Sequence, residues 1–195
     1  MNHYNNKVFV KVFSLLSIFL ITSNLLRAQQ FNLSNNESSV QIFGTSSLHD
    51  WHLDAESYNG VIVFKNVESG EIDKMKIDIV AESLKSGKSS MDRNTYKALK
   101  TDEYNTISFQ LAEVKESISK GEGLYSMTAL GDLTISGVKN RIPLEFSLRM
   151  DGDKLTLSGE KKIKMTDYKV DPPKALLGTI TTGDDITIKF NSTFK

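Results

Sequence analysis

The sequence predicts an all-β protein: a closed antiparallel up-and-down β-barrel of about eight strands with one short helix. Three observations support this prediction. Apolar and polar residues alternate through most of the chain after residue 30, glycine-containing turns separate the alternating segments, and only two short stretches break the pattern. Because side chains alternate across a strand, each segment has one apolar and one polar face, which is typical of antiparallel sheets.

The first 28 residues predict a cleaved signal peptide. Lys7 and Lys11 precede an apolar run over residues 12–21, and Ala28 offers a small residue before Gln29. The run is shorter than the span of about 20 residues that a transmembrane helix needs, so a retained anchor is the weaker alternative. We therefore expect a periplasmic or secreted protein in which residues 29–195 form a single domain.

The composition excludes several classes of protein. The chain has 24 Lys+Arg against 24 Asp+Glu, no Cys, and a hydrophobic fraction of 39%. No basic excess marks a nucleic-acid binder, and the lack of cysteine excludes disulfide scaffolds, thiolate metal sites and lipidated cysteine anchors. Removing residues 1–28 takes away three basic groups and no acidic one, which leaves a slightly acidic remainder.

Alternation predicts eight to ten strands between Val40 and Phe194. The clearest apolar rows lie within residues 75–81, 107–111, 125–135, 142–150 and 186–194, and turns are expected at 68–70, 121–123, 136–140 and Asp151-Gly152. Asp-Gly between alternating segments indicates a type I′ hairpin. The long strand expected over residues 124–135 favours closure into a barrel, which leaves no edge. We assign Lys161, Lys162 and Lys164 to an outward strand face or to the protection of a strand edge.

Two stretches depart from the strand pattern. Residues 90–100 contain good helix formers after a candidate serine N-cap at Ser90, so they predict a short helix. Residues 171–178 are expected to form one more turn, which two prolines open and Gly178 closes.

The interior of an eight-stranded barrel is either packed by side chains or holds one small ligand, and the pattern alone does not choose. Candidate lumen residues are the large apolar ones on the inward rows: Phe64, Met75, Ile77, Phe109, Met127, Leu133, Leu144, Phe146 and Phe190. Methionine and phenylalanine suit an adaptable apolar tunnel. The alternative is that these side chains simply pack against one another.

Several ordered segments resemble one known family. They are residues 46–51 (Ser-Ser-Leu-His-Asp-Trp), Gly60, residues 91–101, 104–109, 131–138, 165–168 and 183–188. Over about residues 38–194 the chain resembles the YceI-like, polyisoprenoid-binding family of exported bacterial proteins. Asn105 stands where that family usually has proline. The resemblance implies an extended lipocalin-like barrel that binds a long isoprenoid chain in its lumen.

Polar residues near the expected barrel mouth are candidates for contact with a lipid head group. His49 and Trp51 are expected to be buried, polar-tipped side chains that are hydrogen-bonded within the fold. On a strand, His49 and His52 point to opposite faces, so we predict no metal site there. The predicted helix adds the basic row Arg93, Lys97 and Lys100, with Tyr96 beside it and Lys85 and Lys88 before it; the alternative is an ordinary solvated helix face.

We therefore expect an exported, non-enzymatic protein that holds an isoprenoid lipid, such as a quinone or a polyprenyl phosphate, for transport, storage or sequestration. No cofactor besides the bound lipid and no nucleic-acid partner is expected; transient membrane contact and a homodimer are compatible with this reading. The first alternative is a structural or interaction domain with a packed core. The second is a lipid-modifying enzyme that uses His49 and Asp50, although the sequence lacks the Gly-x-Ser-x-Gly and His-Glu-x-x-His motifs.

Overall fold

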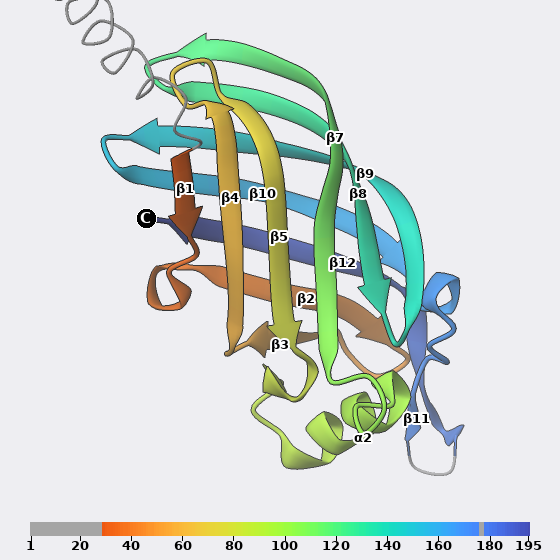
Figure 1. Ribbon diagram of the computed structural model, residues 1–195. Coiled ribbons are helices and arrows are strands. Elements are labelled where there is room, and N and C mark those ends of the chain that lie inside the picture. The colour runs from red at the N-terminus through yellow and green to blue at the C-terminus, as the bar shows by residue number, and fades with distance from the viewer. Residues whose placement is uncertain (1–28, 176–177) are drawn as a thin grey trace, which may run out of the picture.

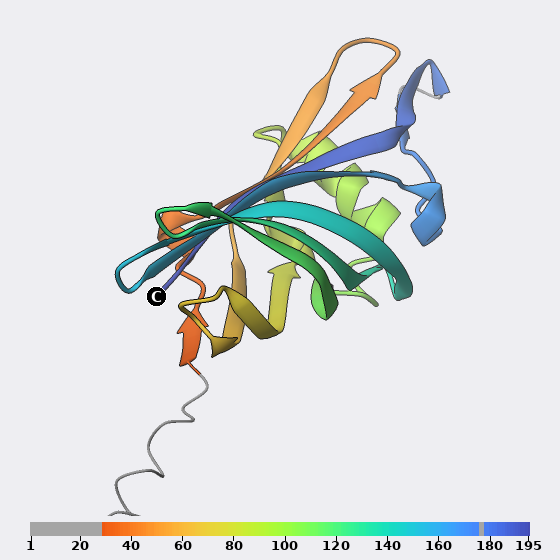
Figure 2. The ribbon, with the colours of Figure 1, turned by 90° about the horizontal axis from the view of Figure 1, so that it is seen from above.

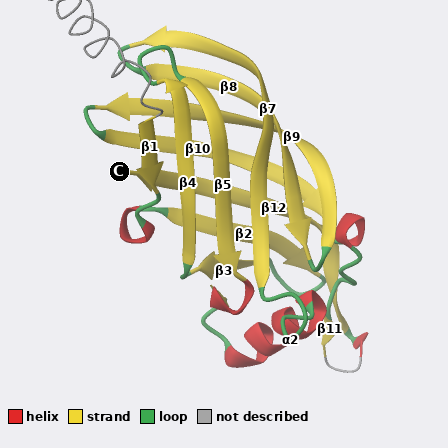
Figure 3. Cartoon of the chain, in the orientation of Figure 1, coloured by secondary structure: helices red, strands yellow, loops and turns green. Residues whose placement is uncertain are grey.

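The computed structural model describes residues 29–175 and 178–195 and places them in one strongly curved antiparallel sheet with a helix at one end (Figures 1 and 3). The predicted signal peptide lies outside the described residues. Within the described part of the chain, no helix has the length and apolar character needed to cross a membrane.

The sheet is built mainly from consecutive strands. The elements are β1 (Gln29–Asn32), β2 (Ser39–Ser46), β3 (Trp51–Ala55), β4 (Tyr58–Asn66), β5 (Glu71–Val80), β6 (Leu84–Lys85), α2 (Ser89–Leu99), β7 (Thr106–Gly121), β8 (Leu124–Ile135), β9 (Val138–Asp151), β10 (Lys154–Lys164), β11 (Lys174–Ala175) and β12 (Ile180–Phe194), with 3₁₀ turns η1 (Asn35–Glu37), η2 (Ala81–Ser83) and η3 (Thr166–Tyr168). Their order across the sheet is β1-β4-β5-β7-β8-β9-β10-β12-β2-β3-β6, and β11 pairs with β12.

The prediction of an all-β, antiparallel, up-and-down fold with one helix is confirmed, but the prediction of a closed eight-stranded barrel is wrong. Eleven strands form an open half-barrel. The strands at its two edges, β1 and β6, have only four and two residues, and they do not pair with each other in the described sheet. The sheet bends so that β4 and β5 cross in front of β10 and β12 in Figure 1, and Figure 2 shows the same curvature from above.

The two sides of the half-barrel meet at the end that carries both described termini, which we call the base. Leu33 donates its N–H to the carbonyl of Gly60 at 2.9 Å and forms a bridge with Phe194 of β12. Asn32 and Lys195 exchange two backbone hydrogen bonds of 2.7 and 2.9 Å. The chain that follows β1 therefore joins β4 to β12, and the opening lies at the other end.

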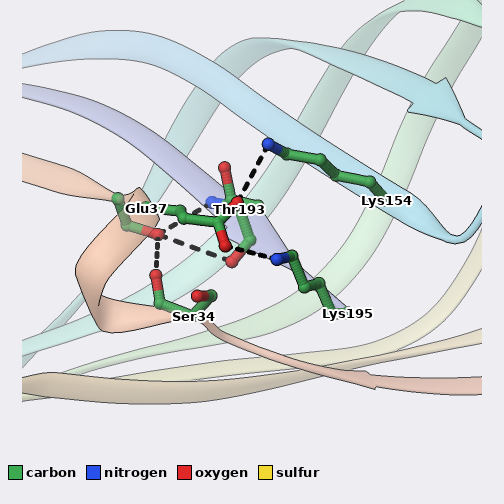
Figure 4. Close-up of polar contacts among 6 residues, drawn as sticks. Ser34, Glu37, Lys154, Thr193 and Lys195 are labelled. Atoms are coloured by element: carbon green, nitrogen blue, oxygen red, sulfur yellow. Dashed lines mark hydrogen bonds and ion pairs between the residues drawn. The ribbon is translucent and has the colours of Figure 1, made fainter.

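A small polar cluster reinforces the base (Figure 4). Glu37 pairs with Lys195 and, at 3.0 Å, with Lys154, and the hydroxyl of Ser38 accepts the N–H of Thr193 at 2.9 Å. The hydrogen bond from Lys195, followed by that from Lys154, lowers the pKa of Glu37 below its ordinary value. The cluster ties η1 to β10 and to the end of β12.

The turns lie where the glycine pattern predicts them, with one difference of type. Asp151 pairs with Lys154, so the loop of the β9–β10 hairpin is Gly152-Asp153. Of these two residues only Gly152 has a positive φ, of 61°. A positive φ at the first loop position alone corresponds to a type II′ turn, so the expected type I′ turn is wrong.

The predicted helix is confirmed as α2, but its N-terminus begins differently. The N-cap is Lys88, without a side-chain cap, and Ser90 lies inside the first turn. Asp92 instead accepts the N–H of Ser86 at 2.8 Å and its hydroxyl at 2.6 Å, which fastens the loop before the helix. The turn expected over residues 171–178 falls partly outside the described residues, and its Lys174–Ala175 part is strand β11.

Candidate functional site

An apolar cavity of about 330 Å³ opens between the β2–β3 hairpin, helix α2, residues 165–174 and the start of β12; we call it the outer cavity. Its apolar lining consists of Val40, Ile42, Leu48, Trp51, Leu53, Ile79, Leu84, Met91, Ala98, Leu99, Ile107, Ile135, Met165, Tyr168, Val170, Pro173, Ile180, Ile186 and Ile188. Polar side chains are a minority of the lining, and they include His49, Lys88 and Lys174. A mostly apolar pocket with few polar groups is the usual form of a ligand site.

A second cavity of about 90 Å³ adjoins the first inside the sheet; we call it the inner cavity. Four apolar residues, Val40, Ile79, Ile107 and Ile188, line both cavities. The rest of the inner lining is Met75, Ile77, Phe109, Leu133, Ile142, Leu144, Phe146, Leu157, Lys161, Phe190 and Ser192. These four shared residues show that the two cavities lie next to each other. These cavities count against the alternative of a fully packed interior.

The predicted lumen residues separate into two groups. Seven of them line the inner cavity: Met75, Ile77, Phe109, Leu133, Leu144, Phe146 and Phe190. Phe64 and Met127, which are 0% and 1% exposed, belong instead to the main packed core and line neither cavity. Residues of β4, β5, β8 and β10 pack against one another there, so that part of the expected lumen is filled. Ligand contact by the other seven stays a prediction.

Glycines make room for aromatic side chains on the inner face of the sheet. A Cβ atom built on Gly131 would lie 2.1 Å from Cζ of Phe109, and one on Gly159 would lie 2.8 Å from Cζ of Phe190. Since real Cβ contacts are not that short, each ring occupies space that any other residue would fill. Phe109 and Phe190 thus rest against the sheet and line the inner cavity without plugging it.

Trp51 lies at the mouth of the outer cavity. Its indole covers Gly44, its partner across the β2–β3 ladder, where a Cβ would be 2.2 Å from the ring. The indole N–H donates to the carbonyl of Thr45 at 2.9 Å. Half-burial of Trp51 agrees in part with the predicted buried, hydrogen-bonded side chain. Beyond it, Leu48 at the hairpin tip is 66% exposed and also lines the cavity.

His49 does not match the prediction of a buried side chain. It is exposed on the hairpin tip, where Nδ1 lies 2.7 Å from the carbonyl oxygen of Asp50. The residue nevertheless borders the outer cavity. His52 pairs with Asp54 at 3.6 Å, away from His49. Within residues 29–175 and 178–195, no group of three or more His, Cys, Asp or Glu side chains is placed to hold a metal ion.

Helix α2 presents a different face to the cavity from the one that the sequence suggested. Arg93, Lys97 and Lys100 are exposed and do not line either cavity. Tyr96 also points elsewhere: its hydroxyl lies 2.8 Å from the carbonyl of Glu82 and fastens the helix to the preceding chain. The basic row therefore lies on a solvated face of the helix, and its contact with a head group stays a prediction.

The helix residues that do line the outer cavity are less polar. They carry no charge and are Ser90, Met91, Asn94, Thr95, Ala98 and Leu99; of these, Met91, Thr95 and Ala98 recur at helical spacing. Sequence reasoning followed the charged row and missed this one, although the i, i+4, i+7 spacing of Met91, Thr95 and Ala98 was visible. The basic groups at the rim are Lys88, just before the helix, and Lys174 of β11.

The prediction of an outward strand face is wrong for Lys161, because this residue lies on the inner face of β10. It pairs with Ile188, whose side chain lines both cavities, and residues paired across a ladder share a face. The β9–β10 ladder ends at Gly159, so β10 runs without β9 beside it at Lys161. Lys161 is half-buried there.

Two buried hydroxyls in the described part of the chain have no hydrogen-bond partner: those of Tyr168 and Ser192. Tyr168 lines the outer cavity, and its burial, followed by the charge of Asp167, raises the pKa of its hydroxyl. Ser192 lines the inner cavity. Unpaired buried hydroxyls are uncommon in folded proteins and call for an explanation.

Solved structures with this fold come from several bacteria. BcnA of Burkholderia cenocepacia has a TM-score of 0.67 and 16% identity over 83% of this chain and 98% of its own. A polyisoprenoid binding domain from Saccharophagus degradans, implicated in plant cell wall breakdown, has a TM-score of 0.65 and 13% identity over 87% and 99%. A Campylobacter jejuni YceI protein has a TM-score of 0.55 and 22% identity over 72% and 82%.

No curated protein matches the chain. The model of the YceI-like domain, however, matches residues 31–194, which include nearly every strand described above. This match confirms the resemblance noted in the sequence. The chain belongs to the family of YceI-like domain proteins.

Proposed function

We propose that this protein is an exported, non-enzymatic binding protein that holds the tail of an isoprenoid or similar amphipathic lipid in the outer and inner cavities. The observation that carries the proposal is the pair of adjoining apolar cavities inside the half-barrel. Membership of the YceI-like family and the fold shared with a polyisoprenoid binding domain support it.

Burial of apolar surface provides the binding free energy. Each methylene group removed from water contributes about 0.8 kcal/mol, against an association cost of about 4–15 kcal/mol. A tail of several isoprene units offsets that cost without any dedicated polar contact. The length and thickness of the tail would then determine which lipids bind most tightly. The head group would lie at one end of the space formed by the outer and inner cavities.

The lipid would enter from a membrane at the hairpin tip. Leu48 is the most exposed large apolar side chain of the described residues, and it stands at the mouth of the outer cavity. Lys88 and Lys174 flank the same mouth and would contact anionic head groups. Export rests on residues 1–28, and intact-mass measurement of the protein recovered from the periplasm would test the cleavage.

The test is to purify the protein from a bacterial host, extract it with organic solvent and identify the extracted lipids by mass spectrometry. The matched variants are Ala98→Trp and Lys97→Trp. Both add the same indole to adjacent helix positions, but Ala98 lines the outer cavity and Lys97 is exposed outside it. We expect lipid with the wild type and with Lys97→Trp, and at least tenfold less with Ala98→Trp.

Two results would count against the proposal. One is a wild-type protein that carries no lipid and takes up no added isoprenoid. The other is equal lipid content in the two tryptophan variants, both folded by circular dichroism, which would put the lipid outside the cavity.

A further inference from the structure

Ser192 is a fully buried hydroxyl in an otherwise apolar part of the inner cavity. It is 0% exposed and has no hydrogen-bond partner among the described residues. Strand pairing places it opposite Leu157, which is 2% exposed and lines the same cavity. Paired residues share a face of the sheet, so the Ser192 side chain projects inward with Leu157. A buried hydroxyl without a partner destabilises the fold, so a ligand that supplies the partner gains affinity.

We propose that the end of the ligand lying in the inner cavity carries an uncharged carbonyl oxygen, which accepts a hydrogen bond from Ser192. This inference rests on the proposed function and specifies the chemistry of the bound lipid. It also reverses the arrangement expected from the sequence, in which the head group lies at the mouth. The lipid would enter with its oxygen-bearing end first and leave its tail in the outer cavity.

The chemistry of the inner cavity favours a carbonyl over a charged group. Phe109, Phe146 and Phe190 line the same cavity as Ser192 and offer no hydrogen bonds. An ionised phosphate would lose much of its hydration in this mostly apolar space, whereas a carbonyl has far less hydration to lose. Lys161, the other polar residue of the lining, is half-buried, so its ammonium group keeps access to water.

The test compares two probes that differ only at one oxygen. Geranylgeranylacetone carries a ketone at the end of four isoprene units, and its hydrocarbon analogue has a methylene group in place of that carbonyl. We expect the wild type to bind the ketone about five- to tenfold more tightly, the range of one net hydrogen bond. Affinities are measured by titration calorimetry with each probe in the same detergent.

Three variants isolate the contact. Ser192→Ala should bind both probes with equal affinity, and it should fold, because it removes an unpaired polar group. Ser192→Cys keeps a weak donor of similar shape and should lose most of the preference. Ser158→Ala is the matched control: this serine pairs with Asn191 one position away, is exposed on the outer face, and should retain the full preference.

A last measurement tests whether the inner cavity binds an anion, with geranylgeranyl phosphate as the probe and Lys161→Met as the variant. If the phosphate binds more tightly than the ketone and Lys161→Met abolishes that advantage, the inner cavity accepts an anion and the inference is overturned. It is equally overturned if Ser192→Ala keeps the wild-type preference for the ketone. In both cases tail binding, and with it the proposed function, stands. Failure of the wild type to bind any of the three probes would remove both.

Discussion

The ring of Phe109 rests directly on Gly131 of the neighbouring strand, so closely that a Cβ atom at Gly131 would lie 2.1 Å from Cζ and 2.2 Å from Cε2. Phe109 also lines the inner cavity. The missing side chain on β8 therefore determines how far the ring on β7 projects into the space that we assign to the lipid.

Replacing Gly131 with alanine should push the Phe109 ring into the inner cavity. We expect a loss of unfolding free energy of about 1–3 kcal/mol, as for other overpacked cores, and a preference for shorter tails. Urea unfolding and a series of isoprenoids of increasing length measure the two effects. Adding Phe109→Leu to Gly131→Ala should restore both, and a double variant no better than the single one would refute the steric explanation.

Trp51 should report occupancy of the outer cavity. It is the single tryptophan of the chain, and its half-buried indole lies at the cavity mouth. A lipid tail that displaces water from the ring should shift its fluorescence to shorter wavelength. In a Trp51→Phe background, Lys97→Trp puts the indole on the solvated helix face, where the same lipid should cause no shift. A shift of equal size there would indicate non-specific adsorption.

Leu48→Asp should slow the uptake of lipid from vesicles without weakening the binding itself. The exposed hairpin tip is the part that we expect to enter the membrane surface, and a carboxylate there opposes insertion. Transfer from vesicles should fall several-fold, while affinity for lipid presented in detergent stays unchanged. Ile118→Asp is the matched control, because Ile118 is 41% exposed on β7 but does not line either cavity.

The basic groups at the rim, and not those on the helix face, should affect binding to anionic vesicles. Lys88→Gln together with Lys174→Gln should reduce binding several-fold at low salt, and the difference should shrink as salt screens the charges. The triple change of Arg93, Lys97 and Lys100 to glutamine should reduce binding to the same vesicles less, because these side chains lie away from the mouth. The reverse order of effects would restore the helix face as the head-group site.

The base should weaken on acidification through Glu37. Lys195 and Lys154 lower the pKa of this carboxyl in the folded state, so its stabilising contribution is complete above its unfolded pKa of about 4.3 and is lost as the pH falls through the folded value. Glu37→Gln should therefore lower Tm at pH 7, and its deficit relative to the wild type should shrink as the pH falls through the folded value. Glu122→Gln, at the β7–β8 turn, should follow the wild type throughout; a Glu37→Gln deficit that persists at low pH would contradict the assignment.

Much of the sheet could be predicted from alternation, because a strand with one buried face has an apolar residue at every second position. The rows containing Met75, Phe109 and Phe146 indeed face the interior. Closure could not be predicted in this way. It depends on which strands pair at the edges, and β6 contributes only Leu84 and Lys85, too few residues to show a period.

The candidate site was less accessible to sequence reasoning. The inner cavity follows from the strand rows, but the position of helix α2 over the mouth depends on tertiary contacts such as the anchoring of Tyr96 beside Glu82. Without knowledge of that contact, the sequence does not show which row of the helix, the charged one or the uncharged one, faces the cavity. Ser192 gave no signal, because one serine among apolar neighbours on a strand is ordinary until its surroundings are known.

The open edges of the half-barrel have a mechanical consequence. Residues 32–34 fasten the base, while β1 and β6 leave the described sheet unsealed toward the mouth. Bending of a sheet whose edge strands do not pair with each other ruptures none of the ladders between neighbouring strands. We therefore expect the sheet to adapt to tails of unequal thickness by elastic deformation, where a sealed cylinder would have to break pairing.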